Sequence, residues 1–207
     1  MLSPLFDKLV PVNLKGKPTD LENTKTFNSK SEAQDAFKRA YKRMLNVTIW
    51  HKLIGFASAD FALKDTLGRR SNRLAEVGDY FKIDIPDPGP SSGDGYDWVV
   101  VEAIKDNRRP EAEEEAYGMR LRSTKTPNKT GDEVAHFFTS EATSTLLVSR
   151  YQNTVSCSYH GRNEVINTET EKIKDKIRNT IVGAGAMLGI SELQWSALIK
   201  SFLEREV

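Results

Sequence analysis

The chain has 207 residues and a mass of 23.3 kDa, which is long enough for one substantial hydrophobic core with helical extensions. Hydrophobic residues make up 38% of the chain and charged residues 29%, a balance that excludes disorder of the whole chain. The formal net charge of +1 disfavours nucleic-acid binding, because domains with that function usually carry a clear excess of positive charge. The single cysteine, Cys157, excludes an intramolecular disulfide and a cysteine-based metal cage.

The N-terminal region contains no targeting pattern and no regular period. It lacks the basic start and apolar core of a secretory signal, and no apolar run in the chain approaches the ~20 residues of a membrane span. We therefore expect a soluble, cytoplasmic protein without a membrane partner. Residues 1–28 contain Pro4, Pro11 and Pro18, and we expect them to form a loosely ordered N-terminal arm. An arm that becomes ordered on a partner is the alternative.

Residues 29–55 are expected to form a helical lead-in. Ser29 and Glu32 have the spacing of a capping box, in which each side chain satisfies a free backbone N–H. Apolar residues then recur at three and four positions, which predicts an amphipathic helix ending near Leu45: Ala33, Ala36, Phe37, Ala40 and Tyr41. Residues 47–56 suit either a strand or a short buried helix, and we favour the helix.

Residues 56–166 are expected to form a β domain. The two-residue apolar period and the turn residues predict strands at 57–63, 80–85, 97–104, 117–123, 135–139, 144–150 and 154–162. No helix-length crossover separates them, so the sheet is expected to be antiparallel. The charged stretch 104–116, with its glutamates at 111–115, is expected to be an exposed connection.

The predicted fold class is α+β: a small, partly closed antiparallel β-barrel with one N-terminal helix and two C-terminal helices. The sequence Val77-Gly78-Asp79-Tyr80 at the start of one strand resembles SH3-like and OB-like barrels. This resemblance implies a type of fold and no particular function.

Residues 167–207 are expected to form a helical pair packed on the barrel. Thr168 and Glu171 have the spacing of a second capping box, and a further helix begins near Ser191. That last helix carries a continuous apolar stripe: Trp195, Leu198, Ile199, Phe202 and Leu203. Self-association through these helices is the alternative to packing on the barrel.

Sequence motifs for catalysis are weak. The chain lacks a P-loop, a dinucleotide-binding glycine motif and a G-x-S-x-G elbow, so nucleotide hydrolysis is disfavoured and any Ser/His/Asp trio is arbitrary. Cys157 and His160 are expected on opposite faces of one strand, with Cys157 buried and inert. His51, His136 and His160 form no H-x-H or H-x-x-x-H pair, and we expect no metal or cofactor.

Two features favour binding. The Pro/Gly/Ser loop at 87–96 is long for a hairpin and presents Asp94 and Tyr96, although it also suits a variable surface loop. If their strands are neighbours, six side chains form one polar, positive sheet face that suits a carboxylate, a phosphate or an acidic partner, although it also suits a simply solvated face: Arg120, Arg122, Ser156, Ser158, His160 and Arg162.

We therefore expect a non-catalytic binding or assembly module that contacts a protein partner or a small anionic ligand. The alternatives are a nucleic-acid-binding barrel protein and a hydrolase that uses His160.

Overall fold

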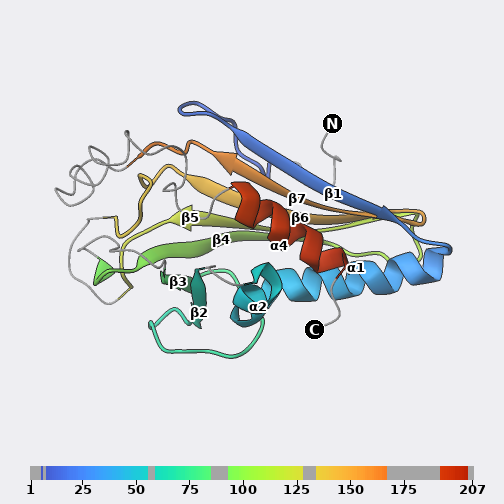
Figure 1. The fold of residues 1–207 in the computed structure, drawn as a ribbon, viewed down its shortest axis with the longest axis horizontal. Helices are drawn as coiled ribbons and strands as arrows, with labels where there is room; N and C mark the ends of the chain where they lie inside the picture. The colour runs from blue at the N-terminus through green and yellow to red at the C-terminus, as the bar shows by residue number, and fades with distance from the viewer. Residues whose placement is uncertain are drawn as a thin grey trace.

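The described part of the chain forms one antiparallel sheet with helices packed against one of its faces (Figure 1). The computed structural model describes residues 6, 8–55, 59–84, 93–127, 134–166 and 192–204. Within these ranges the strands are β1 (Thr19–Thr26), β2 (Asp60–Lys64), β3 (Tyr80–Asp84), β4 (Asp97–Asn107), β5 (Glu114–Ser123), β6 (Thr143–Tyr151) and β7 (Thr154–Arg162). The helices are α1 (Lys30–Leu45), the 3₁₀ helix η2 (Val47–Ile49), α2 (Trp50–Ile54) and α4 (Glu192–Glu204).

The sheet has the strand order β1-β7-β6-β5-β4-β3-β2. Strands β2 to β7 follow one another as antiparallel neighbours, and β1 joins the far edge beside β7. The predicted α+β class and antiparallel pairing are confirmed. The predicted barrel is not confirmed, because β1 and β2 are the two ends of this strand order within the described residues.

The helices define an inner and an outer face of the sheet. Both α1 and α4 contact β7; α1 also packs on β6, and α4 on β1, α1 and α2. The face they cover is the inner face, and the opposite one is the outer face. The apolar stripe of α4 is buried there, including Trp195, Leu198 and Phe202, so the expected packing of the last helix on the sheet is observed. The preceding helix, predicted from Thr168, lies outside the described residues.

The capping box at the start of α1 forms as predicted, with one difference. The Glu32 backbone N–H donates to Ser29 Oγ at 3.2 Å, while the Glu32 carboxylate accepts from the backbone N–H of Asn28, at 3.3 Å, one residue before the cap. The apolar positions behind the cap, from Ala33 to Leu45, are buried on the inner face. The helix exists because a capped start and an apolar side coincide.

Strand β1 corrects the predicted N-terminal arm. Residues 19–26 pair with β7 over their whole length, from Thr19 opposite Gly161 to Thr26 opposite Thr154. The sequence of β1 is almost entirely polar, with Leu21 as its one apolar side chain. It therefore lacks the two-residue apolar alternation that predicts a strand. An edge strand exposed on one face can form through ladder hydrogen bonds with few apolar contacts.

Two further expectations in the β domain were wrong. The connection expected at 104–116 is largely strand, because β4 continues to Asn107 and β5 begins at Glu114. Residues 135–139 form no strand, and Phe138 makes only a single bridge with Ile166.

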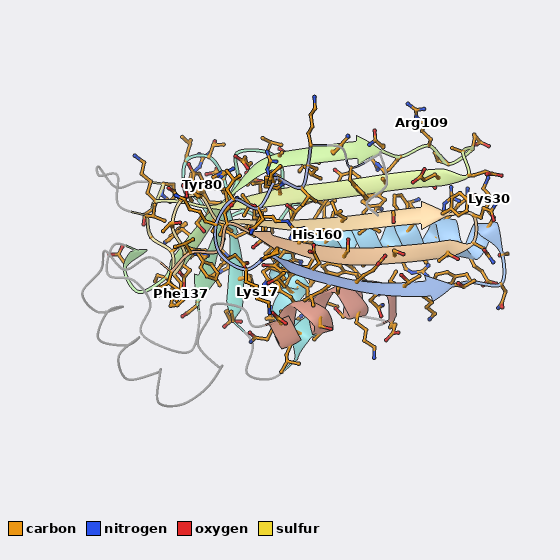
Figure 2. The ribbon with its side chains drawn as sticks, turned by 90° about the horizontal axis from the view of Figure 1, so that it is seen from above. Lys17, Lys30, Tyr80, Arg109, Phe137 and His160 are labelled. Atoms are coloured by element: carbon orange, nitrogen blue, oxygen red, sulfur yellow. The ribbon has the colours of Figure 1, made fainter. Side chains whose placement is uncertain are left out.

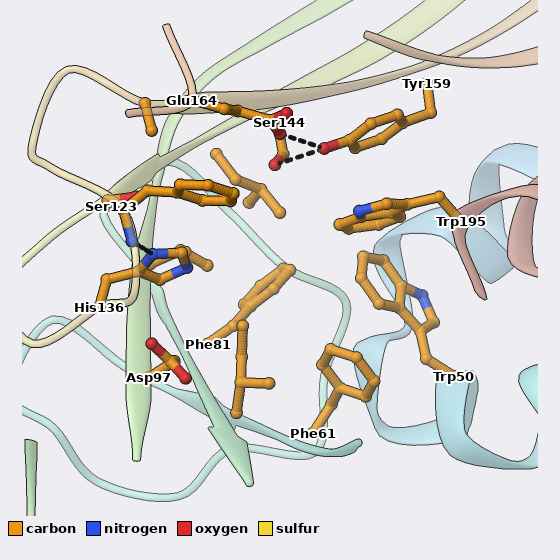
Figure 3. Close-up of a pocket in the computed structure, with 15 residues that line it drawn as sticks. Trp50, Phe61, Phe81, Asp97, Ser123, His136, Ser144, Tyr159, Glu164 and Trp195 are labelled. Atoms are coloured by element: carbon orange, nitrogen blue, oxygen red, sulfur yellow. Dashed lines mark hydrogen bonds between the residues drawn. The ribbon is translucent and has the colours of Figure 1, made fainter. Parts of the chain in front are cut away.

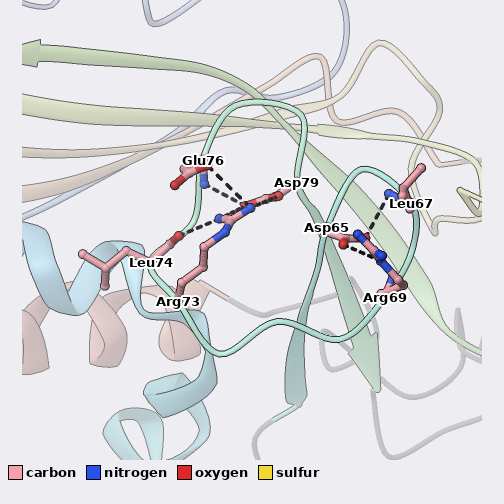
Figure 4. Close-up of polar contacts among 7 residues, drawn as sticks. All are labelled: Asp65, Leu67, Arg69, Arg73, Leu74, Glu76 and Asp79. Atoms are coloured by element: carbon pink, nitrogen blue, oxygen red, sulfur yellow. Dashed lines mark hydrogen bonds and ion pairs between the residues drawn. The ribbon is translucent and has the colours of Figure 1, made fainter.

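Two aspartates organise the connection between β2 and β3 (Figure 4). Asp65 accepts from the backbone N–H groups of Leu67 and Arg69, both at 2.9 Å. Asp79, which is 1% exposed, accepts from both terminal nitrogens of Arg73, at 2.6 and 2.8 Å. The backbone carbonyl of Asp79 also accepts the backbone N–H of Val101 on β4 at 2.8 Å. This network holds the start of β3 and thereby positions Phe81 on the inner face.

Candidate functional site

A cavity lies on the inner face, between the sheet and helices α2 and α4 (Figure 3). About 40 Å³ of it is open to the centres of water molecules, which is room for a few waters. Its lining comes from eight elements of the fold, which are α2, the strands β2 to β7, and α4, and also from the segment 136–142 and from Glu164. The side chains fall into an aromatic wall and two polar groups.

The aromatic wall is built from α2, α4 and three strands. Trp50 meets the rings of Phe61 and Phe81 edge to face, with ring centroids 5.3 and 5.6 Å away. Trp195 stacks on Tyr159 at 4.2 Å with an angle of 18° between the rings, and it lies 6.3 Å from Trp50. These contacts fix the wall in place, because each ring is held by another from a different element.

The first polar group is a hydrogen-bonded chain from β6 and β7. Tyr159 Oη donates to Glu164 Oε1 at 2.9 Å, and Ser144 Oγ lies 3.2 Å from the same hydroxyl. Burial raises the pKa of Glu164 above its ordinary value, and the charge of Glu192 adds to the rise, although the hydrogen bonds from Tyr159 and Thr19 and the charge of Arg162 oppose it. Burial also raises the pKa of Tyr159, so the phenol stays protonated.

The second polar group lies where β4 begins. Asp97 is 3% exposed and accepts the backbone N–H of Phe137 at 2.6 Å. The backbone N–H of Phe138 donates to His136 Nδ1 at 2.9 Å, so that ring nitrogen is an acceptor. Burial lowers the pKa of His136, with the charge of Asp97 opposing it, and the imidazole is therefore neutral near pH 7.

The charges around the cavity are of one sign. Asp97 and Glu164 are the acidic lining residues, and no lysine or arginine is among the described residues that line it. The polar members of this lining were not among the predicted site residues. A signal was present in the sequence, because Ser123 and Ser144 occupy inward positions next to apolar ones on their strands.

The three arginines and His160 that were predicted as a binding face do share the outer face. Through the intervening strand β6, Arg120 lies level with His160, and Arg122 lies level with Arg162. Figure 2 labels His160 and shows the sheet with α1 behind it. Arg120 and Arg122 lie on β5, whereas His160 and Arg162 lie on β7. These two strands are not direct neighbours, because β6 lies between them. The structure also places carboxylates beside all four of these residues.

On β5, the arginines share the carboxylate of Glu102. Arg122 donates to its two oxygens at 2.7 and 3.1 Å, and Arg120 Nε lies 2.6 Å from Oε2. Arg120 also donates to the carbonyl groups of Lys8 and Leu9, which lie across the outer face. Burial alone would raise the pKa of Glu102, but Arg122 and Arg120 outweigh it and the pKa is lowered.

On β7, His160 and Arg162 share the carboxylate of Asp20. His160 Nδ1 lies 2.5 Å and Arg162 Nη2 lies 2.6 Å from Asp20 Oδ1. The other ring nitrogen of His160, Nε2, lies 3.0 Å from Ser158 Oγ. Cys157 faces the core on the opposite side of the strand, as predicted, and burial raises the pKa of its thiol.

The predicted binding loop is described only at its end, since residues 85–92 lie outside the described residues. Asp94 has a φ of +57°, and the Tyr96 backbone N–H donates to the Gly93 carbonyl at 3.1 Å. The Tyr96 ring lies 3.3 Å from Lys82 Nζ, measured to the ring centroid. Tyr96 therefore contacts β3, whereas Arg120, Arg122, His160 and Arg162 lie on β5 and β7.

Within the described ranges, no group of three or more His, Cys, Asp or Glu side chains could hold a metal ion. None of the described helices is both long and apolar enough to cross a membrane.

Comparison with known proteins gives a distant likeness only. No family model matches the chain, and no curated protein matches it. Among solved structures, an uncharacterised protein from Bacillus thuringiensis has 13% identity and a TM-score of 0.35, over 91% of this chain and 100% of its own. Ara h 8.0201 has 11% identity and a TM-score of 0.35, over 90% of this chain and 99% of its own. Neither likeness is close enough to bear on function.

Proposed function

We propose that this protein binds a small molecule in the inner-face cavity. The observation that carries the proposal is the combination of an enclosed aromatic wall with polar side chains that converge on it from separate elements, which is the usual form of a small-ligand site. The proposal keeps the predicted class of function, a non-catalytic binding module, and moves the site to the inner face. We further propose that the sheet is partly closed, as the sequence predicted, because a sheet curled around α2 and α4 would enclose a ligand on more sides.

The outer face is the weaker candidate for a small anionic ligand. Its three arginines and His160 are already paired with Glu102 and Asp20, so an anion would have to compete with two carboxylates. The same pairing reduces the positive charge available to a nucleic-acid backbone. Self-association through the last helix would have to use residues outside its buried stripe, such as Leu193, which is 82% exposed.

A fragment screen tests the cavity proposal. Ala142 lines the cavity and is 3% exposed, so a leucine at this position would fill part of the space. The matched control is Ala112→Leu, a half-buried alanine in the turn before β5, remote from the cavity. We expect small aromatic fragments to give saturation-transfer NMR signals with the wild type and with A112L, and to lose them with A142L. Circular dichroism checks that both variants are folded.

Two results would contradict the proposal. One is that no fragment binds the wild type. The other is that the fragments bind a folded A142L variant as well as they bind the wild type.

A second candidate function, hydrolysis, is favoured by one specific arrangement on the outer face. The hydrogen-bonded series Ser158 Oγ, His160 Nε2, His160 Nδ1 and Asp20 Oδ1 has the connectivity of a catalytic triad. With the imidazole proton on Nδ1, Nε2 accepts from the serine hydroxyl. During acylation by an ester, Ser158 Oγ would attack the carbonyl carbon, Nε2 would take the serine proton and pass it to the departing alcohol, and water would later release the acid.

The neighbouring Ser156 provides a matched control for this second candidate. Ser156 lies on the same face of β7, but its hydroxyl bonds Thr24 at 2.8 Å instead of a histidine. We expect p-nitrophenyl acetate to acylate the wild type and S156A at equal rates and to react at least tenfold more slowly with S158A and H160A. Equal rates in all four proteins, measured by p-nitrophenol release and by mass spectrometry, would eliminate this candidate.

A further inference from the structure

We propose that the ligand of the inner-face cavity is a small organic cation, with an ammonium group attached to an aromatic ring or a short apolar chain. This inference rests on the proposed function, since it names the chemical class that the same site would bind. Three independent features support it: the sign of the charges around the cavity, the way other acids in this protein are paired, and the aromatic wall.

Other buried carboxylates in the described part of the chain have an arginine partner. Asp79 is bonded to Arg73, and Glu115 to Arg150. This is the expected arrangement, because a buried carboxylate without a cation is costly. The protein therefore supplies its own counter-charge where an acid serves only the fold.

The two acids of the cavity lack such a partner. Glu164 accepts from the Tyr159 hydroxyl at 2.9 Å and from the Thr19 hydroxyl at 3.5 Å, and it forms no ion pair with a described residue. Asp97 accepts a backbone N–H and likewise forms no ion pair with a described residue. The raised pKa of Glu164 agrees with a carboxylate that burial and a neighbouring acid disfavour in its charged form. A bound ammonium group would reverse that effect.

The aromatic wall suits the same class of ligand. Trp50, Trp195 and Phe81 surround the cavity together with the ring of Tyr159 (Figure 3). The faces of such rings attract cations electrostatically, and tryptophan does so most strongly. An anion would meet both the negative ring faces and the two carboxylates, so the cavity discriminates by charge.

The cavity volume limits the size of the ligand. Adding the radius of a water molecule around the 40 Å³ open to water centres gives a void on the order of 150 Å³, comparable to one that holds a benzene ring. Benzylammonium, benzyl alcohol and benzoate share one ring and a short arm and differ in charge. They therefore form a matched series of probes for this site.

The test measures the dissociation constants of these three probes by isothermal titration calorimetry at pH 7. We expect benzylammonium to bind the wild type roughly tenfold more tightly than benzyl alcohol, with benzoate the weakest. We expect Glu164→Gln to remove most of that preference. Glu141→Gln is the control, because Glu141 is exposed and paired with Lys15, so its loss should leave the preference unchanged.

The outcomes separate this inference from the proposed function. Tighter binding of benzyl alcohol or benzoate, or an unchanged preference in a folded E164Q variant, would overturn the cationic ligand while leaving the cavity as a binding site. Binding of none of the three would also overturn it. The fragment screen with A142L decides separately whether the cavity binds small molecules at all.

Discussion

The two ends of the sheet's inner face each hold a carboxylate, one buried and one half-buried, and these two carboxylates have different partners. At the end beside the start of α1, Glu115 is 3% exposed and Arg150 is fully buried, and Arg150 Nε donates to Glu115 at 2.8 Å. The same arginine donates to three carbonyl groups, those of Ala112, Glu113 and Gln152. At the cavity end, Glu164 is bonded to a phenol and a distant threonine hydroxyl.

The difference separates a structural acid from an acid available to a ligand. Arg150 and Glu115 find their ion-pair and hydrogen-bond partners within the chain, so this end of the sheet offers no unpaired charge to a ligand. Around Glu164, the chain provides a carboxylate, aromatic faces and open volume. Arg162 acts on Glu164 only through its charge, because its ion pair is with Asp20, and no described cation forms an ion pair with Glu164. The comparison predicts that substitutions at the first end alter stability, while those at the second end alter binding and pH dependence.

The largest expected effect follows from Arg150→Met. Removing the guanidinium leaves Glu115 buried without a partner, and we expect a loss of about 3–5 kcal/mol in the free energy of unfolding, measured by urea denaturation. The control is Arg69→Met, because the Arg69 side chain is 72% exposed and its solvent-screened pair with Asp65 should contribute little to stability. Equal losses in the two variants would show that the Arg150 pair is not a structural element of this kind.

A smaller loss is expected from Tyr159→Phe, which removes the hydroxyl between Ser144 and Glu164. We expect a cost of about 1–3 kcal/mol, because a buried carboxylate loses its closest donor. Tyr151→Phe is the matched control, since Tyr151 is 59% exposed on the neighbouring strand and should change stability little. A Y159F variant as stable as the control would mean that the hydrogen bonds of the Tyr159 hydroxyl do not stabilise the fold.

The smallest effect, and one of opposite sign, is expected from Glu164→Gln. Because the pKa of Glu164 is raised in the folded state, that state binds more protons than the unfolded state between the ordinary and the raised pKa. This carboxyl therefore lowers stability as the pH rises from about 4.3 through the raised value. We expect E164Q to gain stability relative to the wild type over that range and to keep the gain at pH 7.

Denaturation of both proteins at several pH values checks this expectation. The neighbours Glu192, Arg162 and Tyr159 are the same in both proteins, so the difference between the two curves isolates Glu164. A constant difference across the range would contradict the raised pKa. The opposite slope would mean that Glu164 already has a cationic partner in the protein.

Local patterns predicted the local elements of this fold. The capping residue Ser29 and the apolar spacing behind it identified α1, and the alternation of Val155, Cys157 and Tyr159 identified β7 and its inward face. Strand β1 was not predicted, because its stability comes from pairing with a strand more than 100 residues away. Glu115 was misassigned as exposed because its partner, Arg150, is brought beside it only by the β5–β6 pairing.

Local sequence patterns could not predict the cavity either, because it is formed by residues that are distant in the sequence. Trp50, Phe81 and Trp195 belong to elements far apart in the chain, and each is an ordinary buried aromatic when considered alone. Only the order of the strands and the position of α4 leave space between them. Inward serines such as Ser144 are the kind of local signal that could have pointed to this end of the sheet.

A crystal structure of the protein with benzylammonium would show whether the inner-face cavity binds an organic cation. We expect one molecule inside the cavity, with its ring against the aromatic wall near Trp195 and its nitrogen within hydrogen-bond distance of a Glu164 oxygen. A cavity that holds only water, while the probe is absent or bound elsewhere on the surface, would rule out this binding site for the cation.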